Sequence, residues 1–387
     1  MTEVLLSDIC ELIVDCPHST AVDEGKGYPL VRTPNIGKGR LIYQGMHRVS
    51  EDIYLQRNKR ATPHEDDLIF AREATAGNVA LIQEGEKVCL GQRTVLIRPN
   101  KALVNPAFLT YFLLAPKQQY NLLSTANGAT VAHVNLPTIR NLKLELPNLD
   151  VQRRIAEVLS RYDALIENYQ RQIKLLEEAA QRLYKEWFVD LRFPGHQSTP
   201  IINNLPQSWQ KKKLGEILVF FDKKRKPLSS MQRMSMEKIF PYYGAATLMD
   251  YVDDYLFDGI YLLLGEDGTV ITPENYPVLQ YVWGKFWVNN HAHVLRGADG
   301  ISTEYLYMMF KEMPISDVVT GAAQPKISQG RLSEKSIILP SIELIQKWSS
   351  ITKPFFDSIR NKSEQIRNLS EARDRLLPKL MSAEIEV

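Results

Sequence analysis

The feature that most constrains this chain is a regular heptad pattern between Gln152 and Trp187. Apolar residues recur at every seventh position in two interleaved rows, and neither Pro nor Gly interrupts the stretch. Two such rows predict a helix with an apolar seam that needs a partner helix along its length. At 1.5 Å per residue the helix is on the order of 50 Å long. Its predicted seam residues are Ile155, Leu159, Tyr162, Ile166, Tyr169, Ile173, Leu176 and Leu183.

A second helical pattern near the C-terminus can supply this partner. Its predicted seam residues are Ile359, Ile366, Leu369 and Leu376. The pattern is imperfect, because Lys362 and Arg373 also occupy seam positions. Pro354 is expected to kink the helix, since proline removes one backbone hydrogen bond. The heptads alone favour a structural coiled-coil stalk.

The composition fits a globular chain of two or three domains. The 387 residues are 44% hydrophobic and 24% charged, which are ordinary values. A net charge of +2 selects no class of partner, so a nucleic-acid binder would have to gather its positive charge locally. The three cysteines form no CxxC pair, and no long apolar run is present. We therefore expect a soluble protein of the reducing cytoplasm, without a disulfide framework or a zinc site.

The chain repeats one unit, a mixed domain followed by a long helix. The clearest match aligns GATVAHVNLPTIRNLKLELP with GAAQPKISQGRLSEKSIILP, so that Gly128 and Pro147 map to Gly321 and Pro340 with one offset of 193 residues. Other segments recur in the same order, which chance does not produce. A stretch rich in Pro, Gly, Asn and Ser separates the two copies and predicts a linker.

These observations predict an α/β (α+β) fold with a pseudo-twofold internal repeat, in which two tandem domains are separated by two long antiparallel coiled-coil helices. The expected segments are a first domain at 1–150, a first spacer helix at 151–188, a linker at 189–208, a second domain at 209–340 and a second spacer helix at 341–387.

The sequence carries no motif of a known catalytic site. It lacks the phosphate loop G-x-x-x-x-G-K-[ST], the G-x-G-x-x-G turn, H-E-x-x-H and G-x-S-x-G. His291 and His293 stand two residues apart on a probable strand, which would put both on one face. No further metal ligands stand near them in sequence. Glu266 and Asp267 precede a glycine and read as turn residues or as an acidic metal-binding pair. We expect no metal site and no catalytic residue.

The ordered set of segments resembles the specificity subunit of Type I restriction-modification enzymes. The resemblance covers essentially the whole chain. It rests on the GAxxxxxx…LP run into the helices led by Gln152 and Gln346, on FPYYGA and YLFDGIYLLLGEDG, and on the NNHAHVLR segment at 289–296. It departs where AREATAG in the first copy stands against GEDGTV in the second.

The resemblance implies a non-enzymatic subunit whose two target-recognition domains each read one half of a split sequence in double-stranded DNA. The helix pair would act as a ruler and bind two methyltransferase (modification) subunits, and two restriction/translocase subunits would join the full complex. S-adenosylmethionine, ATP and Mg are expected in those partners and none in this chain. Two alternatives remain from the residues alone: a coiled-coil scaffold holding two protein-binding domains, and an enzyme with a degenerate site.

Residues able to contact DNA are present but scattered. Arginine can read guanine, and asparagine or glutamine can read adenine, while lysine suits phosphate contacts. A basic run at 223–226 fits phosphate contacts and equally fits a solvated loop. The first-domain candidates are Arg32, Asn35, Lys38, Arg72, Asn78, Gln92, Arg93, Thr130 and His133. The second-domain candidates are Lys223, Lys224, Arg225, Lys226, Tyr242, Tyr243, Asn289, Asn290, His291, Gln324 and Lys326.

Overall fold

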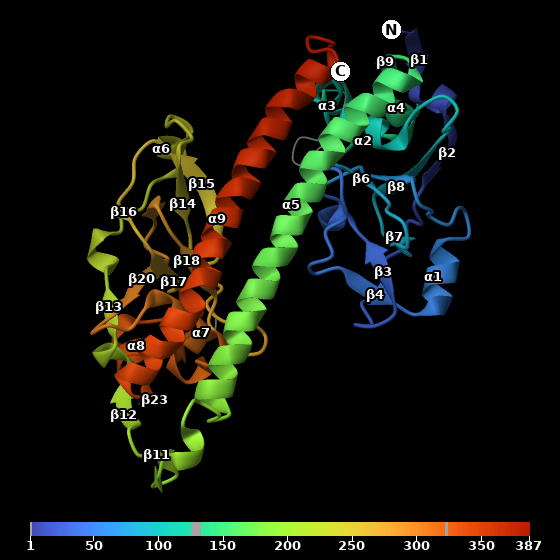
Figure 1. Ribbon diagram of the computed structural model, residues 1–387. Coiled ribbons are helices and arrows are strands. Elements are labelled where there is room, and N and C mark those ends of the chain that lie inside the picture. Colours follow the sequence, from blue (N-terminus) through green and yellow to red (C-terminus); the bar gives the residue numbers. More distant parts are fainter. Residues whose placement is uncertain (1, 125–132, 322–323) are drawn as a thin grey trace. The chain divides into compact units, whose positions relative to one another are not determined.

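Both heptad patterns fold as single long helices (Figure 1). The computed structural model describes residues 2–124, 133–321 and 324–387. Helix α5 spans Leu149–Tyr184 and continues as a π-helical turn over Lys185–Val189, and helix α9 spans Ile342–Met381. Among the described residues, no helix is both long and apolar enough to cross a membrane.

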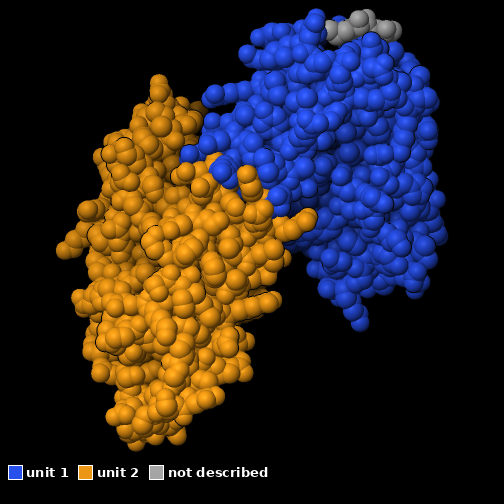
Figure 2. Space-filling view, viewed as in Figure 1, with its two compact units in different colours: residues 1–168, 365–387 blue, residues 169–364 orange. Residues whose placement is uncertain are grey.

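The chain divides into two compact units, which Figure 2 shows in different colours. The first unit comprises residues 1–168 and 365–387, and the second comprises residues 169–364. Each unit therefore contains one mixed domain, part of α5 and part of α9. The protein has a mixed helix-and-sheet fold with two repeated domains and two long antiparallel helices.

The first unit is built on a four-stranded sheet of order β2-β8-β5-β6, beside a three-stranded sheet of order β4-β3-β7 and the pair β1-β9. Its strands are β1 (Thr2–Leu5), β2 (Cys10–Asp15), β3 (Tyr28–Val31), β4 (His47–Val49), β5 (Leu68–Ala71), β6 (Val79–Leu81), β7 (Cys89–Leu90), β8 (Thr94–Pro99) and β9 (Lys143–Leu146). All four residues of β5 are buried, as expected for the middle of an apolar core.

The helices of the first domain cover this core. They are α1 (Glu51–Arg57), α2 (Pro106–Leu114), α3 (Pro116–Leu123) and α4 (Leu136–Arg140). Helix α2 begins where the side chain of Asn105 accepts a hydrogen bond from the Phe108 amide, and a proline follows this cap. The buried side chains of α2 join Ile155 and Leu159 of α5 and Leu380 of α9 in one apolar cluster.

The second unit repeats this topology. Its main sheet has the order β13-β20-β17-β18, its second sheet the order β15-β14-β19-β16, and the pair β12-β23 takes the place of β1-β9. In both units the second sheet contains one parallel pair, β3 with β7 and β14 with β19. The repeat predicted from the sequence is thus present in the fold.

The strands of the second unit are β10 (Ile201–Ile202), β11 (Leu205–Pro206), β12 (Gln210–Lys213), β13 (Leu218–Phe220), β14 (Phe240–Tyr243), β15 (Leu248–Val252), β16 (Phe257–Asp258), β17 (Tyr261–Gly265), β18 (Leu279–Val282), β19 (Lys285–Val288), β20 (Ala292–Gly297), β21 (Val319–Thr320), β22 (Lys326–Ile327) and β23 (Ser336–Leu339). Its short helices are α6 (Ser230–Met234), α7 (Thr303–Lys311) and α8 (Gln329–Glu334). Short 3-10 turns complete the two units: Leu6–Ile9, Thr33–Asn35, His196–Ser198, Leu214–Glu216, Asp222–Lys224 and Ser316–Val318.

The two long helices run antiparallel within the second unit. The ring of Tyr184 near the end of α5 packs 6.0 Å from that of Trp348 near the start of α9. Earlier on α5, Tyr169 lies 5.2 Å from the ammonium group of Lys362, which comes later on α9. Each predicted seam residue of both helices is buried or half-buried.

The structure adds detail at two places that the sequence singled out. The stretch 189–208 contains a short hairpin of β10 and β11, whose turn residues Asn203 and Asn204 both adopt positive φ angles. Asparagine tolerates this conformation, so an Asn-Asn pair is compatible with a hairpin turn as well as with an irregular linker. Helix α9 is continuous through the exposed Pro354, the residue at which the sequence predicts a kink.

Candidate nucleic-acid interface

A cluster of charged side chains lies at the end of one equivalent strand in each unit. In the first unit it follows β5, and in the second it follows β17. We define the Arg72 cluster as Asp15, Arg72, Glu73, Arg93 and His133. We define the Glu266 cluster as Asp222, Arg225, Glu266, Asp267, His291, His293 and Lys326.

Arg72 holds the first cluster together from a buried position. Its Nη1 donates to both carboxylate oxygens of Asp15, at 2.9 and 2.8 Å, and its Nε donates to the Val134 carbonyl at 3.0 Å. Its Nη2 lies 2.9 Å from Nε2 of His133. A guanidinium only donates, so His133 Nε2 must accept and the ring proton must lie on Nδ1. That Nδ1 faces Glu73 Oε1 at 2.7 Å, which completes a chain of hydrogen bonds.

Arg93 extends this chain to the surface. Its Nη1 lies 2.7 Å from Glu73 Oε2, so Glu73 bridges His133 and Arg93. The Arg93 side chain is 62% exposed, whereas that of Glu73 is 18% exposed. The backbone of Arg93 has a φ of 64°, an uncommon conformation for a residue other than glycine. Glu73 therefore holds the Arg93 guanidinium in place, and the guanidinium is exposed at the surface.

Glu266 takes the place of Arg72 in the second unit. The Arg72 amide donates to the Arg93 carbonyl at 2.9 Å, and its carbonyl accepts from the Val134 amide at 3.0 Å. The Glu266 amide and carbonyl make the same two bonds, with His291 and Ile327, at 2.8 Å each. The charges are inverted between the two sites, because a carboxylate now stands where the first unit has a guanidinium.

The carboxylate of Glu266 is held by cations on two sides. Arg225 Nη1 donates to its Oε2 at 2.6 Å, and Lys326 Nζ lies 3.4 Å from its Oε1. Arg225 Nη1 also donates to the carbonyl of Ala292 at 2.6 Å. The side chain of Arg225 is thus directed into the domain, while its neighbours in the basic run, Lys223 and Lys224, are exposed.

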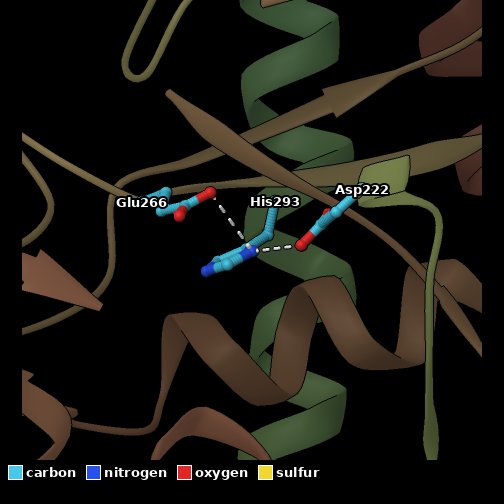
Figure 3. A group of neighbouring side chains, drawn as sticks. All are labelled: Asp222, Glu266 and His293. Atoms are coloured by element: carbon cyan, nitrogen blue, oxygen red, sulfur yellow. Dashed lines mark hydrogen bonds and ion pairs between the residues drawn. The ribbon is translucent and has the colours of Figure 1, made fainter. Parts of the chain in front are cut away.

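His293 lies between Asp222 and Glu266, as Figure 3 shows. The ring is buried, with Nδ1 at 2.6 Å from Asp222 Oδ2 and Nε2 at 2.9 Å from the Ile327 carbonyl. Burial raises the pKa of the Asp222 carboxyl, but the hydrogen bond and charge of His293 outweigh this effect and hold that pKa below its ordinary value. Both ring nitrogens of His293 therefore lie within hydrogen-bonding distance of oxygen atoms.

The same three residues resemble a metal site in their spacing. Asp222, Glu266 and His293 each offer a ligand atom, and these atoms lie within 4.8 Å of one another. However, the oxygens of Glu266 already face Arg225 and Lys326. A divalent cation would have to displace these positive charges, so the donor set fits a network of ion pairs and hydrogen bonds better than a metal centre.

The second unit has its own surface pair. Nδ1 of His291 lies 2.5 Å from Asp267 Oδ1, and the two side chains are 49% and 22% exposed. The sequence suggested that His291 and His293 share one face of a strand. In the structure His291 precedes β20 and is exposed, whereas His293 lies inside β20 and is buried.

Several predicted contact residues have structural roles instead. Asn35 is buried, where it accepts from the Arg32 amide at 3.2 Å and donates to the Ile42 carbonyl at 3.1 Å. The side-chain Nδ2 of Asn78 donates to the Ile36 carbonyl at 2.9 Å. Both side chains thus stabilise their own loops.

Two second-unit candidates are likewise buried. The Tyr242 hydroxyl accepts from the Leu228 amide at 3.0 Å. Asn289 accepts from the His291 amide at 2.9 Å and thereby shapes the turn before β20. Both side chains are buried and hold surface loops in place.

The remaining candidates lie at or near the surface. Lys38, Arg93, Lys223, Lys224, Lys226, Asn290, His291, Gln324 and Lys326 are exposed, and Arg32, Gln92, His133 and Tyr243 are half-buried. Gln92 donates to the His18 carbonyl at 2.9 Å, and Arg32 donates to the Gly45 carbonyl at 3.4 Å. Thr130 lies outside the described residues.

Sequence reasoning missed the acids of both clusters. Asp15, Glu73 and Asp222 were not considered, and Glu266 and Asp267 were weighed only as turn residues or metal ligands. A search for cations misses them, because an acid contributes nothing directly to binding a polyanion. The available signal was positional: Asp15 ends an apolar strand, and Glu73, Asp222 and Glu266 follow one within two residues.

Comparisons with known proteins agree on one family. A family model described as the Type I restriction modification DNA specificity domain matches residues 1–178 and 206–370. The MjaIX Type I restriction enzyme specificity subunit of Methanocaldococcus jannaschii is 25% identical over 411 residues, covering 99% of this chain and 93% of that protein. The MjaVIII specificity subunit of the same organism is 24% identical over 356 residues, covering 85% and 81%.

A solved structure resembles the fold. The S subunit of a Type I restriction-modification system from M. genitalium aligns with a TM-score of 0.55 at 18% sequence identity, covering 98% of this chain and 95% of that one. At this identity the likeness bears on the fold alone.

Proposed function

The chain belongs to the family of Type I restriction-modification DNA specificity proteins, and from this premise we propose that each of its domains reads one half of a bipartite DNA sequence. It is a DNA-recognition subunit without a catalytic role of its own. The chemistry of modification and cleavage therefore belongs to the subunits with which it assembles.

One observation supports the proposal that each domain contacts DNA separately. The two units present basic side chains on the surface at equivalent strand ends, Arg93 in the first and His291 with Lys326 in the second. Fixed donors at the surface suit the edges of bases in the major groove, and exposed lysines such as those of the basic run suit phosphates. Two such surfaces in one chain match a target sequence in two parts.

The partners follow from the same premise. We infer that the helix pair binds two methyltransferase subunits, which carry S-adenosylmethionine, and that two restriction subunits, which use ATP and Mg, join the larger complex. The helix pair would also set the spacing between the half-sites. All of this takes place in the cytoplasm, where the three free cysteines would remain reduced.

Co-expression with the cognate methyltransferase subunit tests the proposal. We expect methylation mapping of the host genome to give one bipartite sequence, and we expect the purified complex to bind a duplex of that sequence with an affinity that falls steeply as salt rises. The chain alone should neither methylate nor cut DNA. A complex that methylates nothing, or methylates without sequence preference, would contradict the proposed function.

A further inference from the structure

We propose that Arg93 and His291 are equivalent base-reading residues, one for each half-site, and that Glu73 and Asp267 are the acids that orient them. The inference rests on the proposed function and extends it to single residues. It predicts that Arg93 reads a guanine in one half-site, and that His291 reads the corresponding position in the other half-site less strictly.

The two pairs occupy the same place in the repeated fold. Arg93 directly precedes β8, and Glu73 lies two residues beyond the end of β5. His291 directly precedes β20, and Asp267 lies two residues beyond the end of β17. In each unit these two strands are antiparallel neighbours in the main sheet.

The backbone hydrogen bonds place the pairs in the same register. The last paired positions are Ala71 with Thr94 in the first unit and Gly265 with Ala292 in the second. The next bond also matches, because the residue after each strand donates its amide to the carbonyl of Arg93 or of His291. The equivalence therefore comes from main-chain geometry and does not depend on the similarity of the side chains.

In both pairs the proposed base-reading side chain is more exposed than the acid. The exposed fractions are 62% for Arg93 against 18% for Glu73, and 49% for His291 against 22% for Asp267. The acid is close enough to orient its partner, at 2.7 Å in the first pair and 2.5 Å in the second. A side chain held in one orientation loses less conformational entropy when it binds a base.

Arg93 and His291 differ in how many contacts they can make with a base. With Nη1 directed to Glu73, the planar Arg93 fork keeps further N–H donors for the N7 and O6 acceptors of guanine. With Nδ1 directed to Asp267, His291 keeps only Nε2 for a base. One contact discriminates bases less than two, so we expect a fixed guanine in the first half-site and a more permissive position in the second.

The experiment uses the complex with the methyltransferase subunit and compares Arg93→Lys, Arg93→Ala and His291→Arg. Each complex is tested by methylation mapping and by binding to duplexes that vary one base at a time. Arg93→Lys keeps the charge but removes the fork. We expect both Arg93 variants to lose about five- to 150-fold of the preference for guanine at one position of the first half-site, while the second half-site is unchanged.

The reciprocal variant tests the equivalence itself. His291→Arg should create a guanine preference at one position of the second half-site and leave the first half-site unchanged. Lys101→Ala is the matched control, because Lys101 is also 62% exposed and ion-paired, to Asp66 at 2.6 Å, but follows β8 at its other end. This control should leave every base preference unchanged.

The outcomes separate the two proposals. If the wild-type complex recognises no bipartite sequence, the proposed function fails. If the wild-type complex does recognise one, but the Arg93 variants keep every base preference, the inference alone is overturned. Altered preference in both half-sites from one substitution would also overturn it, since each pair is assigned to one half-site. Thermal unfolding of each variant confirms that it is folded. If Arg93→Ala does not fold, Arg93→Lys alone tests the inference.

Discussion

At the scale of single residues, several buried or half-buried charges form pairs that link separate elements. Arg373 occupies a position on α9 that the heptad pattern reserves for an apolar side chain. Its Nη1 donates to Asp163 Oδ1 on α5 at 2.5 Å, and the Tyr111 hydroxyl donates to Oδ2 of the same carboxylate at 2.5 Å. Burial and the Asp163 charge both raise the pKa of Tyr111, which keeps its proton available as a donor.

Removing Arg373 should therefore be costly. In Arg373→Ala the Asp163 carboxylate stays buried without its cation, and we expect the free energy of unfolding to fall by about 3–5 kcal/mol. Arg375→Ala is the control, because Arg375 is exposed and lies 3.9 Å from Glu371, and it should cost about 0–1 kcal/mol. Urea unfolding measures both. Equal losses in the two variants would mean that the buried pair contributes no more than a surface pair.

Residue identity alone selects side chains that can contact DNA, but it does not show where in the fold they gather. Arg72, Arg93, His133, Arg225, His291 and Lys326 were chosen because their side chains can bind DNA, and the structure brings them into two clusters. Asn35, Asn78, Tyr242 and Asn289 were chosen on the same grounds but support loops. The difference lies in the partners that each side chain meets, which depend on long-range packing that no local pattern reveals.

At the scale of elements, the heptad pattern was the strongest guide. It predicted both long helices, since apolar spacing specifies a helix regardless of its partner. It could not assign roles to the exceptions: Arg373 pairs with Asp163, and Lys362 lies over Tyr169. The hairpin of β10 and β11 was read as linker because its Asn-Asn turn is made of residues that also favour irregular chain.

The length of the helix pair should set the spacing of the half-sites. Four residues are inserted in α5 between Asn168 and Tyr169, and four in α9 between Glu364 and Gln365, where the compact units divide. Each insertion lengthens its helix by ~6 Å and nearly completes a turn, so the seam is disturbed only locally. With ~3.4 Å per base pair, the spacer should grow by about one or two base pairs.

Methylation mapping measures this spacer directly. The half-site sequences should not change, because the insertions alter no residue of either cluster. An insertion in α5 alone serves as control: it puts the two seams out of register, so we expect reduced activity without a new spacer. An active double-insertion enzyme with the original spacer would show that the helices do not determine the distance.

At the scale of the whole molecule, the repeat was predictable but the division into compact units was not. The expected segments 1–150, 151–188, 209–340 and 341–387 follow the order of the sequence. The compact units instead divide each long helix between them, so that residues 365–387 pack with the first domain. Antiparallel pairing of two distant helices causes this division, and a pattern read along the chain cannot reveal it.

The repeated fold offers a sharp test of how the two domains share recognition. In the second unit, Gln210–Lys213 of β12 pairs with Ser336–Leu339 of β23, which brings the two ends of the domain together. A replacement of residues 209–340 by the matching segment of a relative therefore exchanges a closed unit and leaves the antiparallel helix pair in place. Neither end of the replacement cuts through a strand.

We expect this exchange to change one half of the recognised sequence and to leave the other half and the spacer as they were. The reason is that the Glu266 cluster moves with the segment, whereas the Arg72 cluster and both helices stay. Methylation mapping of the hybrid complex reads all three features at once. Replacing residues 2–146, the segment from β1 to the end of β9, should change the opposite half. A hybrid that alters both halves would show that the domains do not read DNA independently.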